Sequence, residues 1–201
     1  GNHAFSEDVD LSFTGTLFRE RRNVGTRLSD NRRDVMDFST RLRAEAENGD
    51  EIQLALFGEL QDFDNANTRV AQDRESETLA LTQKVPSSQI GASAQWSRGF
   101  DMAEAHLLAG LDFRHIEGKN EQTIVNINGV DPGDLDTQGK QQAIGAFMEL
   151  ELHPLPELEV LTSIRLDYWR NFDGQRKDQA GDRNHFSDKS EFEVSPRLSL
   201  R

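Results

Sequence analysis

The chain has 201 residues, and 23 Lys and Arg against 36 Asp and Glu give it a formal net charge of −13 at pH 7. This acidic balance disfavours a nucleic-acid partner, because binding along a phosphate backbone requires a basic surface. The absence of cysteine excludes disulfides, thiolate zinc sites and cysteine nucleophiles. No apolar run approaches the roughly 18–20 residues of a membrane-spanning helix, and residues 1–6 have no secretory signal pattern.

Apolar residues recur with a period of two along much of the chain, and this is the period of a strand. The first case is Leu11, Phe13 and Leu17, which are separated by polar residues. In chain order the predicted strands are 9–19, 37–45, 52–61, 89–96, 104–114, 144–152, 160–168 and 191–200. Asn48-Gly49 between the second and third segments predicts a tight hairpin. Further turns are expected at 97–101 and 153–157.

The connections between these strands alternate between short and long. Those near Asn48, Gly99 and Pro156 are short, whereas 21–35, 64–88, 117–141 and 173–190 are long and polar. Structureless loops beyond about 12–15 residues are uncommon in a compact domain. An up-and-down barrel in an outer membrane has short periplasmic turns and long external loops. The pattern therefore predicts an all-β, antiparallel membrane barrel.

The polar positions of the strands point to the same side and carry charges of both signs, which suits a hydrated lumen. These residues are Arg41, Arg43, Glu59, Asp112, Arg114, Arg165, Asp167 and Arg197. A soluble antiparallel barrel or sandwich, acting as a binding scaffold with its apolar stripes buried, has the same alternation. Periodicity alone does not separate the two folds.

The aromatic residues near the strand ends suggest positions for the membrane interfaces. Tyr168 and Trp169 are expected in an aromatic girdle at one interface and Trp96 at the other. A cross-strand packing pair is the alternative for Tyr168 and Trp169. Arg165 and Asp167 lie two residues apart on one strand face, which predicts a lumenal charge network rather than a substrate site.

Catalytic chemistry has little support in the sequence. The order of Ser, His and Asp fits no catalytic triad, and the histidines are scattered. A membrane-embedded hydrolase would need a facing pair such as Ser163 and His106, which nothing in the sequence brings together. His106 lies two residues from Glu104 and is favoured as a hydrated histidine over a ligand for a metal chelate. We predict no catalytic residue and no cofactor, and we assign no ligand-binding residue.

One acidic loop has the oxygen ligands that Ca²⁺ prefers. Its carboxylates are Asp131, Asp134 and Asp136, with Gly133 between them. Because the spacing does not match the EF-hand pattern, a solvated acidic turn is favoured over a calcium site.

Several segments resemble the barrel of a TonB-dependent outer-membrane receptor. Residues 164–169 are similar to that family's strand with an Arg-x-Asp-Tyr pattern, and 195–200 resemble the Ser-Pro-Arg-aliphatic strand that follows it. Residues 85–98, 107–114 and 143–149 are similar to other barrel strands of the family. The resemblance covers most of residues 9–201.

This resemblance implies a location in the bacterial outer membrane and uptake of a scarce nutrient, such as an iron-siderophore chelate or cobalamin. The family's barrel is of the 22-stranded type, so about eight strands correspond to its middle portion. Residues 1–8 are expected to be an N-terminal extension or the edge of the chain, and 9–201 a partial barrel. The implied partners are the lipid bilayer, the missing plug and remaining barrel strands, TonB acting through the missing N-terminal part, and a small-molecule or metal-chelate ligand.

Overall fold

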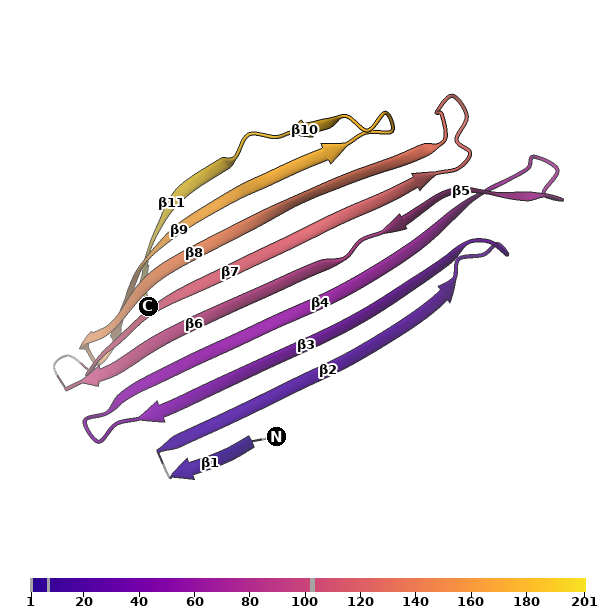
Figure 1. Ribbon diagram of the computed structural model, residues 1–201. Helices are drawn as coiled ribbons and strands as arrows, with labels where there is room; N and C mark the ends of the chain where they lie inside the picture. Colours follow the sequence, from indigo (N-terminus) through magenta and orange to yellow (C-terminus); the bar gives the residue numbers. More distant parts are fainter. Residues whose placement is uncertain (1, 7, 102–103) are drawn as a thin grey trace.

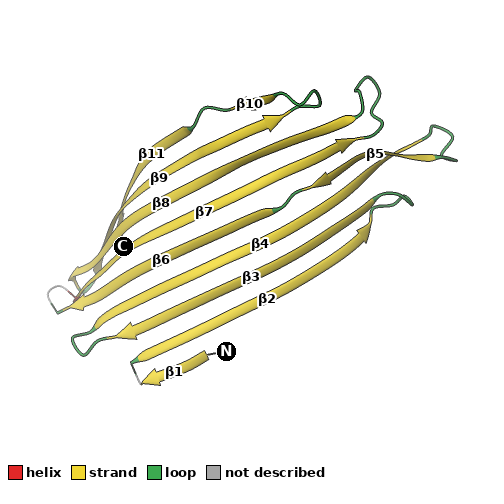
Figure 2. Ribbon diagram, in the orientation of Figure 1, coloured by secondary structure: helices red, strands yellow, loops and turns green. Residues whose placement is uncertain are grey.

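The computed structural model describes residues 2–6, 8–101 and 104–201. These residues form one antiparallel sheet of eleven strands, which is open and curved (Figure 1) and joined by loops and turns (Figure 2). The strands are β1 (Asn2–Ser6), β2 (Val9–Asn23), β3 (Asp30–Glu45), β4 (Asp50–Val70), β5 (Glu77–Lys84), β6 (Ser87–Phe100), β7 (Ala105–Ile124), β8 (Gly133–Leu155), β9 (Leu158–Lys177), β10 (Arg183–His185) and β11 (Lys189–Leu200). No helix in this part of the chain has the length and apolar character to cross a membrane.

Each strand pairs with the strand that follows it in sequence, with two interruptions. β5 and β6 both pair with β4 and β7, and β10 and β11 both pair with β9. Val85 and Pro86 separate β5 from β6, because proline cannot donate a hydrogen bond to the sheet. Counting each such pair as one line, the eight lines from β2 onward match the eight predicted segments, and the predicted fold is confirmed. The short β1 pairs with the outer edge of β2.

The Asn48-Gly49 turn between β3 and β4 is confirmed. The amide of Gly49 donates to the carbonyl of Ala46 at 2.8 Å, and the amide of Ala46 donates to the carbonyl of Asp50 at 2.8 Å. Gly49 has a φ of 80°, in the left-handed region that glycine adopts without a steric penalty. A local sequence signal therefore fixes the pairing of these two strands.

The strand register sorts side chains onto two faces of the sheet. One row of paired residues consists of Leu11, Leu42, Leu54, Ala94, Leu111, Ala146, Leu166 and Val194. We call the face that carries this row the apolar face and the opposite one the polar face. The adjacent row on the polar face contains Arg41, Asp112 and Asp167, and all eight charged residues predicted to share a side lie on this face.

Exposure of the two faces is the reverse of that in a soluble sheet. In β4 the apolar-face residues Ile52, Leu54 and Leu56 are exposed, whereas Glu51 and Gln53 between them are half-buried. The same reversal occurs in β9, where residues 164, 166 and 168 are exposed and the polar-face residues 165, 167 and 169 are half-buried. Among the described residues, only Val35 and Ala105 form buried apolar positions. In the described part of the chain, the apolar face therefore packs against no protein core.

The apolar residues form a band that runs obliquely across the paired rows. One row begins with the ion pair of Asp50 and Arg98 and becomes apolar toward the C-terminal strands, at Leu107, Leu150 and Leu198. A row nearer the other end of the strands changes in the opposite sense, from Leu17, Met36 and Leu60 to Ser88, Glu117 and Lys140. An oblique band is expected of barrel strands, which tilt by about 35–45° from the barrel axis.

The four long polar connections are not loops for most of their length, and this part of the prediction is wrong. β4 continues to Val70 and β5 returns from Glu77, while β7 continues to Ile124 and β8 begins at Gly133. Their backbones pair as in the rest of the sheet, but both faces are polar, so the alternation that marks a strand disappears. The predicted turn at 97–101 is also misplaced, because β6 runs to Phe100; residues 102 and 103 of the actual connection lie outside the described residues.

Candidate functional site on the polar face

An arginine lies between two carboxylates near the middle of the polar face. Arg165 on β9 places Nη1 3.0 Å from Oδ2 of Asp112 on β7, and Nη2 2.7 Å from Oδ1 of Asp167. Nε of Arg165 also donates to Oδ2 of Asp167 at 2.9 Å. The predicted charge network of Arg165 and Asp167 is confirmed, and it extends to a third residue two strands away.

Gly145 makes this reach possible. It lies on β8 in the row between Asp112 and Asp167, directly beneath the guanidinium group. A Cβ atom at this position would be 2.6 Å from Asp112 Oδ2 and 2.9 Å from Arg165 Cζ, closer than real Cβ contacts. Glycine within a strand often marks such a close approach of another group. Here it leaves room for one side chain to cross an entire strand.

A phenylalanine beside the ion pairs also lies over a glycine of the neighbouring strand. The ring of Phe147 lies across Gly110, where a Cβ atom would be 2.5 Å from Cζ of the ring. The guanidinium carbon of Arg165 is 6.0 Å from the centroid of this ring, within range of a cation–π interaction. We call Asp112, Arg165, Asp167, Gly145, Phe147 and Gly110 the polar-face cluster.

The polar-face cluster is a solvent-exposed network of ion pairs that links neighbouring strands. Its two carboxylates and one guanidinium have a net charge of −1, and side-chain exposures of 40% for Arg165, 39% for Asp112 and 35% for Asp167 leave all three open to water. Its side chains are two carboxylates, one guanidinium and one aromatic ring. It links β7, β8 and β9 and places charged groups on the polar face of the sheet.

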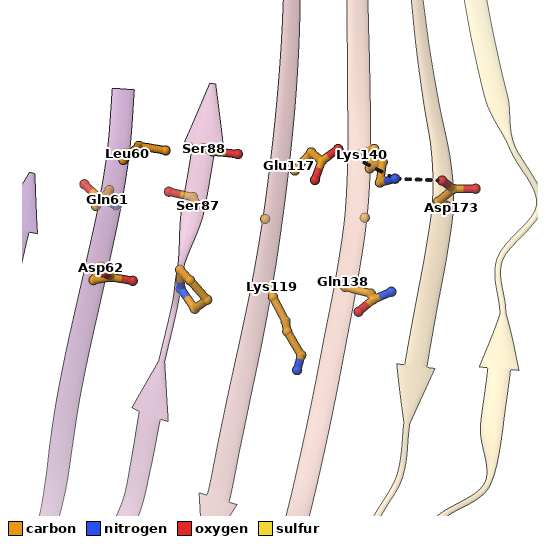
Figure 3. Close-up of a pocket in the computed structure, with 13 residues that line it drawn as sticks. Leu60, Gln61, Asp62, Ser87, Ser88, Glu117, Lys119, Gln138, Lys140 and Asp173 are labelled. Carbon is orange, nitrogen blue, oxygen red and sulfur yellow. Dashed lines mark ion pairs between the residues drawn. The ribbon is translucent and has the colours of Figure 1, made fainter. Parts of the chain in front are cut away.

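A hollow of about 490 Å³ lies on the apolar side of the sheet, at the edge of the apolar band that is nearer the β4–β5 and β7–β8 hairpins (Figure 3). Lys140 projects beside it, with Nζ 3.2 Å from Asp173 and 3.6 Å from Glu117. Leu60 and Ser88 line the hollow from β4 and β6. Within this one row, the apolar Leu60 on β4 is followed by Ser88 and then by the charged Glu117 and Lys140. Such a change is expected at the edge of a lipid-facing band.

The histidine and serine considered from sequence are not brought together. His106 pairs with Glu151 in the sheet, while Ser163 lies on β9 beyond the intervening β8. Two strand spacings amount to about 9–10 Å, too far for a nucleophile and base in contact. Within the described ranges, no three or more His, Asp or Glu side chains gather as a metal site.

The acidic residues considered for Ca²⁺ are divided between a turn and a strand. Asp131 precedes β8, whereas Asp134 and Asp136 lie within it. Oδ1 of Asp134 accepts a hydrogen bond of 2.8 Å from the hydroxyl of Thr123. The preference for a solvated acidic turn over a calcium site stays a prediction.

Tyr168 and Trp169 do not form one girdle, because consecutive strand residues point to opposite faces. Tyr168 shares a row with Ile144 and Phe192 on the apolar face, whereas Trp169 pairs with Ala143 and Glu191 on the polar face. Trp96 lies on the apolar face opposite Ile52 and Ala109. The expectation that Tyr168 and Trp169 share one girdle is therefore wrong, and packing of their rings across strands stays a prediction.

Solved structures with the same fold include a transporter and an import receptor. The copper transporter OprC has a TM-score of 0.76 at 12% sequence identity, with the match covering 99% of this chain and 32% of OprC. The ferric-catecholate import receptor Fiu from E. coli K12 has a TM-score of 0.63 at 9% identity, with coverage of 96% of this chain and 38% of Fiu. The chain thus spans about a third of the length of these proteins. No curated protein sequence matches it.

The family model described as TonB dependent receptor-like, beta-barrel matches residues 2–201. This family consists of non-enzymatic transporters. The match agrees with the sheet topology and with the expectation from the sequence motifs. The chain therefore belongs to the TonB-dependent receptor family and is part of the receptor's β-barrel.

Proposed function

We propose that this chain forms one side of a receptor barrel in the bacterial outer membrane, with its apolar face against the lipid bilayer and its polar face toward the lumen. The single observation that carries the proposal is the reversed exposure of the two faces. Lipid is the medium that makes an exposed row of leucine, isoleucine and phenylalanine favourable, while side chains crowd together on the lumenal side.

The soluble scaffold considered from sequence requires the apolar stripes to converge in a closed core. Leu42, Leu111, Ile164 and Leu198 instead lie on the same apolar face, spread over β3, β7, β9 and β11. Leu111 is 60% exposed and Leu198 is 69% exposed. Family membership and this open face both favour the membrane barrel.

The two tryptophans of the chain provide a matched test of the orientation. Lipids brominated along the acyl chain quench indoles that contact them, so we expect quenching of Trp96 on the apolar face and none of Trp169 on the polar face. The measurement compares the intact receptor in brominated bilayers with its Trp96→Phe and Trp169→Phe variants. Only Trp96→Phe is expected to remove quenchable emission; loss of quenching in Trp169→Phe alone would reverse the faces and reject the proposal.

The proposed substrate is a scarce nutrient, such as an iron-siderophore chelate or cobalamin, and uptake is driven through TonB. Supporting this are the family of the chain and a charged lumenal wall that suits a polar cargo. The plug, the remaining barrel strands and TonB are the partners of this proposal. In this proposal, the ligand is recognised by the plug and by the long hairpins that project beyond the apolar band, among them β4–β5 and β7–β8.

Uptake by whole cells tests the substrate. We expect cells that lack the receptor to lose accumulation of one radiolabelled ferric chelate or of cobalamin, and a plasmid copy to restore it. A protonophore should abolish the restored uptake, because transport through TonB depends on the proton gradient. The control is passive uptake of a small sugar. Unchanged accumulation of every chelate and of cobalamin in the deletion strain contradicts the assignment.

A further inference from the structure

The hairpins at one end of the sheet extend to different heights, which leaves part of a strand edge without a neighbour. The pairing of β3 with β4 ends at Asp30 and Ala66, but β4 continues to Val70 and the β4–β5 hairpin projects beyond the β2–β3 hairpin (Figure 1). An exposed strand edge attracts other chains, and proteins usually cover it. Here the tip of the β2–β3 hairpin, residues 24–29, supplies the cover.

Side-chain hydrogen bonds hold this tip against β4. The hydroxyl of Ser29, a residue only 8% exposed, donates to the carbonyl of Ala66 at 3.2 Å. The hydroxyls of Thr26 and Thr68 are 2.9 Å apart. Two side-chain hydrogen bonds thus join Ser29 and Thr26 of the tip to Ala66 and Thr68 of β4, where the backbone pairing of β3 with β4 ends.

A carboxylate from the next strand completes the contact. Oε1 of Glu77, at the start of β5, accepts a hydrogen bond of 3.0 Å from the backbone amide of Leu28. The hydroxyls of Thr26 and Thr68 and the amides of Leu28 and Arg27 hold the pKa of the Glu77 carboxyl below its ordinary value. The group is therefore ionised at neutral pH, and hydrogen bonds to a charged acceptor are the stronger kind.

We propose that Glu77 is a latch that joins the tip of the β2–β3 hairpin to the β4–β5 hairpin, so that the two hairpins move as one body. The bond from Arg69 Nη1 to Asn128 Oδ1, 2.6 Å long, connects the same β4–β5 hairpin to the β7–β8 hairpin on its other side. The latch rests on the described contacts and does not depend on the substrate of the receptor. The β4–β5 hairpin is then coupled to the β2–β3 hairpin on one side and to the β7–β8 hairpin on the other.

Limited trypsin digestion of the intact, detergent-folded receptor tests the latch. The bond after Arg27 lies in the exposed tip, and its cleavage follows the population of opened tips when opening is fast. We expect Glu77→Ala to raise the rate of this cleavage about ten-fold, since a charge-assisted contact is lost. Glu77→Gln keeps an acceptor and should raise the rate less. Thr26→Val, which removes a hydroxyl on the other side of the latch, should also raise it.

Two internal controls separate the latch from general loosening. Glu75→Ala removes a neighbouring carboxylate for which the described structure shows no hydrogen bond or ion pair, and it should leave cleavage after Arg27 unchanged. Cleavage after Arg74, in the tip of the β4–β5 hairpin, should be the same in the wild type and in the Glu77 and Thr26 variants, which leave the residues on both sides of that bond unchanged. Wild-type rates after Arg27 in Glu77→Ala overturn the proposal. An equal rise after Arg74 also overturns it, because the substitution would then loosen both hairpins in general rather than release one from the other.

Discussion

Leu111→Lys is expected to destabilise the bilayer-embedded receptor by about 2–4 kcal/mol, the usual cost of a basic residue at the lipid-facing midplane of a barrel. Leu111 is 60% exposed, and its neighbours in the paired row are Ala94 and Ala146. It also lies near the middle of the apolar band on β7, which leaves the ammonium group far from either interface. Equilibrium urea unfolding in lipid vesicles measures the change.

Leu108→Lys on the same strand is the matched control. Leu108 is on the polar face, opposite Ser97 and Glu149, where a lysine meets water and a carboxylate. Because Leu108 is half-buried, we expect a cost of about 1 kcal/mol, typical of a point substitution and below the range for Leu111→Lys. If Leu108→Lys were the costly variant and Leu111→Lys the neutral one, the polar face rather than the apolar face would contact lipid, and the proposed orientation would be rejected.

The strands could be predicted from sequence where the two faces meet different media. Alternation of Ile52, Leu54 and Leu56 with polar residues is strict, as expected if one face meets lipid and the other meets water as proposed. The same strand continues through residues 62–70, where most residues on both faces are polar and the period of two carries little hydrophobic signal. The prediction therefore ended each strand where the apolar band ends, although the backbone pairing goes on.

The polar-face cluster was only partly predictable, for a different reason. Arg165 and Asp167 are two residues apart on one strand, so their contact follows from local geometry alone. The contact with Asp112 depends on the register of three strands, which a single sequence does not specify. Gly145 was the available signal, since a glycine inside a strand often marks a close approach. Only the register shows that the approaching group is the guanidinium of Arg165.

Gly145→Ala is expected to lower the free energy of unfolding by about 1–3 kcal/mol, the range for overpacking a well-filled site. The added Cβ would displace the guanidinium of Arg165 from its path to Asp112. Gly139→Ala is the control on the same strand and face, because the nearest atom to its Cβ is Gly174 Cα at 3.9 Å. That variant should be neutral or slightly stabilising, since alanine restricts the unfolded chain. Chemical denaturation of the folded receptor compares the two.

A double-mutant cycle shows whether the Gly145→Ala penalty acts through the arginine. In an Arg165→Ala background the guanidinium is absent, so the same glycine substitution should cost much less than in the wild type. Residues in contact commonly give interaction energies of about 0.5–3 kcal/mol in such cycles. Equal penalties in the two backgrounds would mean that the Cβ clashes with the backbone or with Asp112 alone. The glycine would then not be the opening that lets Arg165 brace β7 against β9.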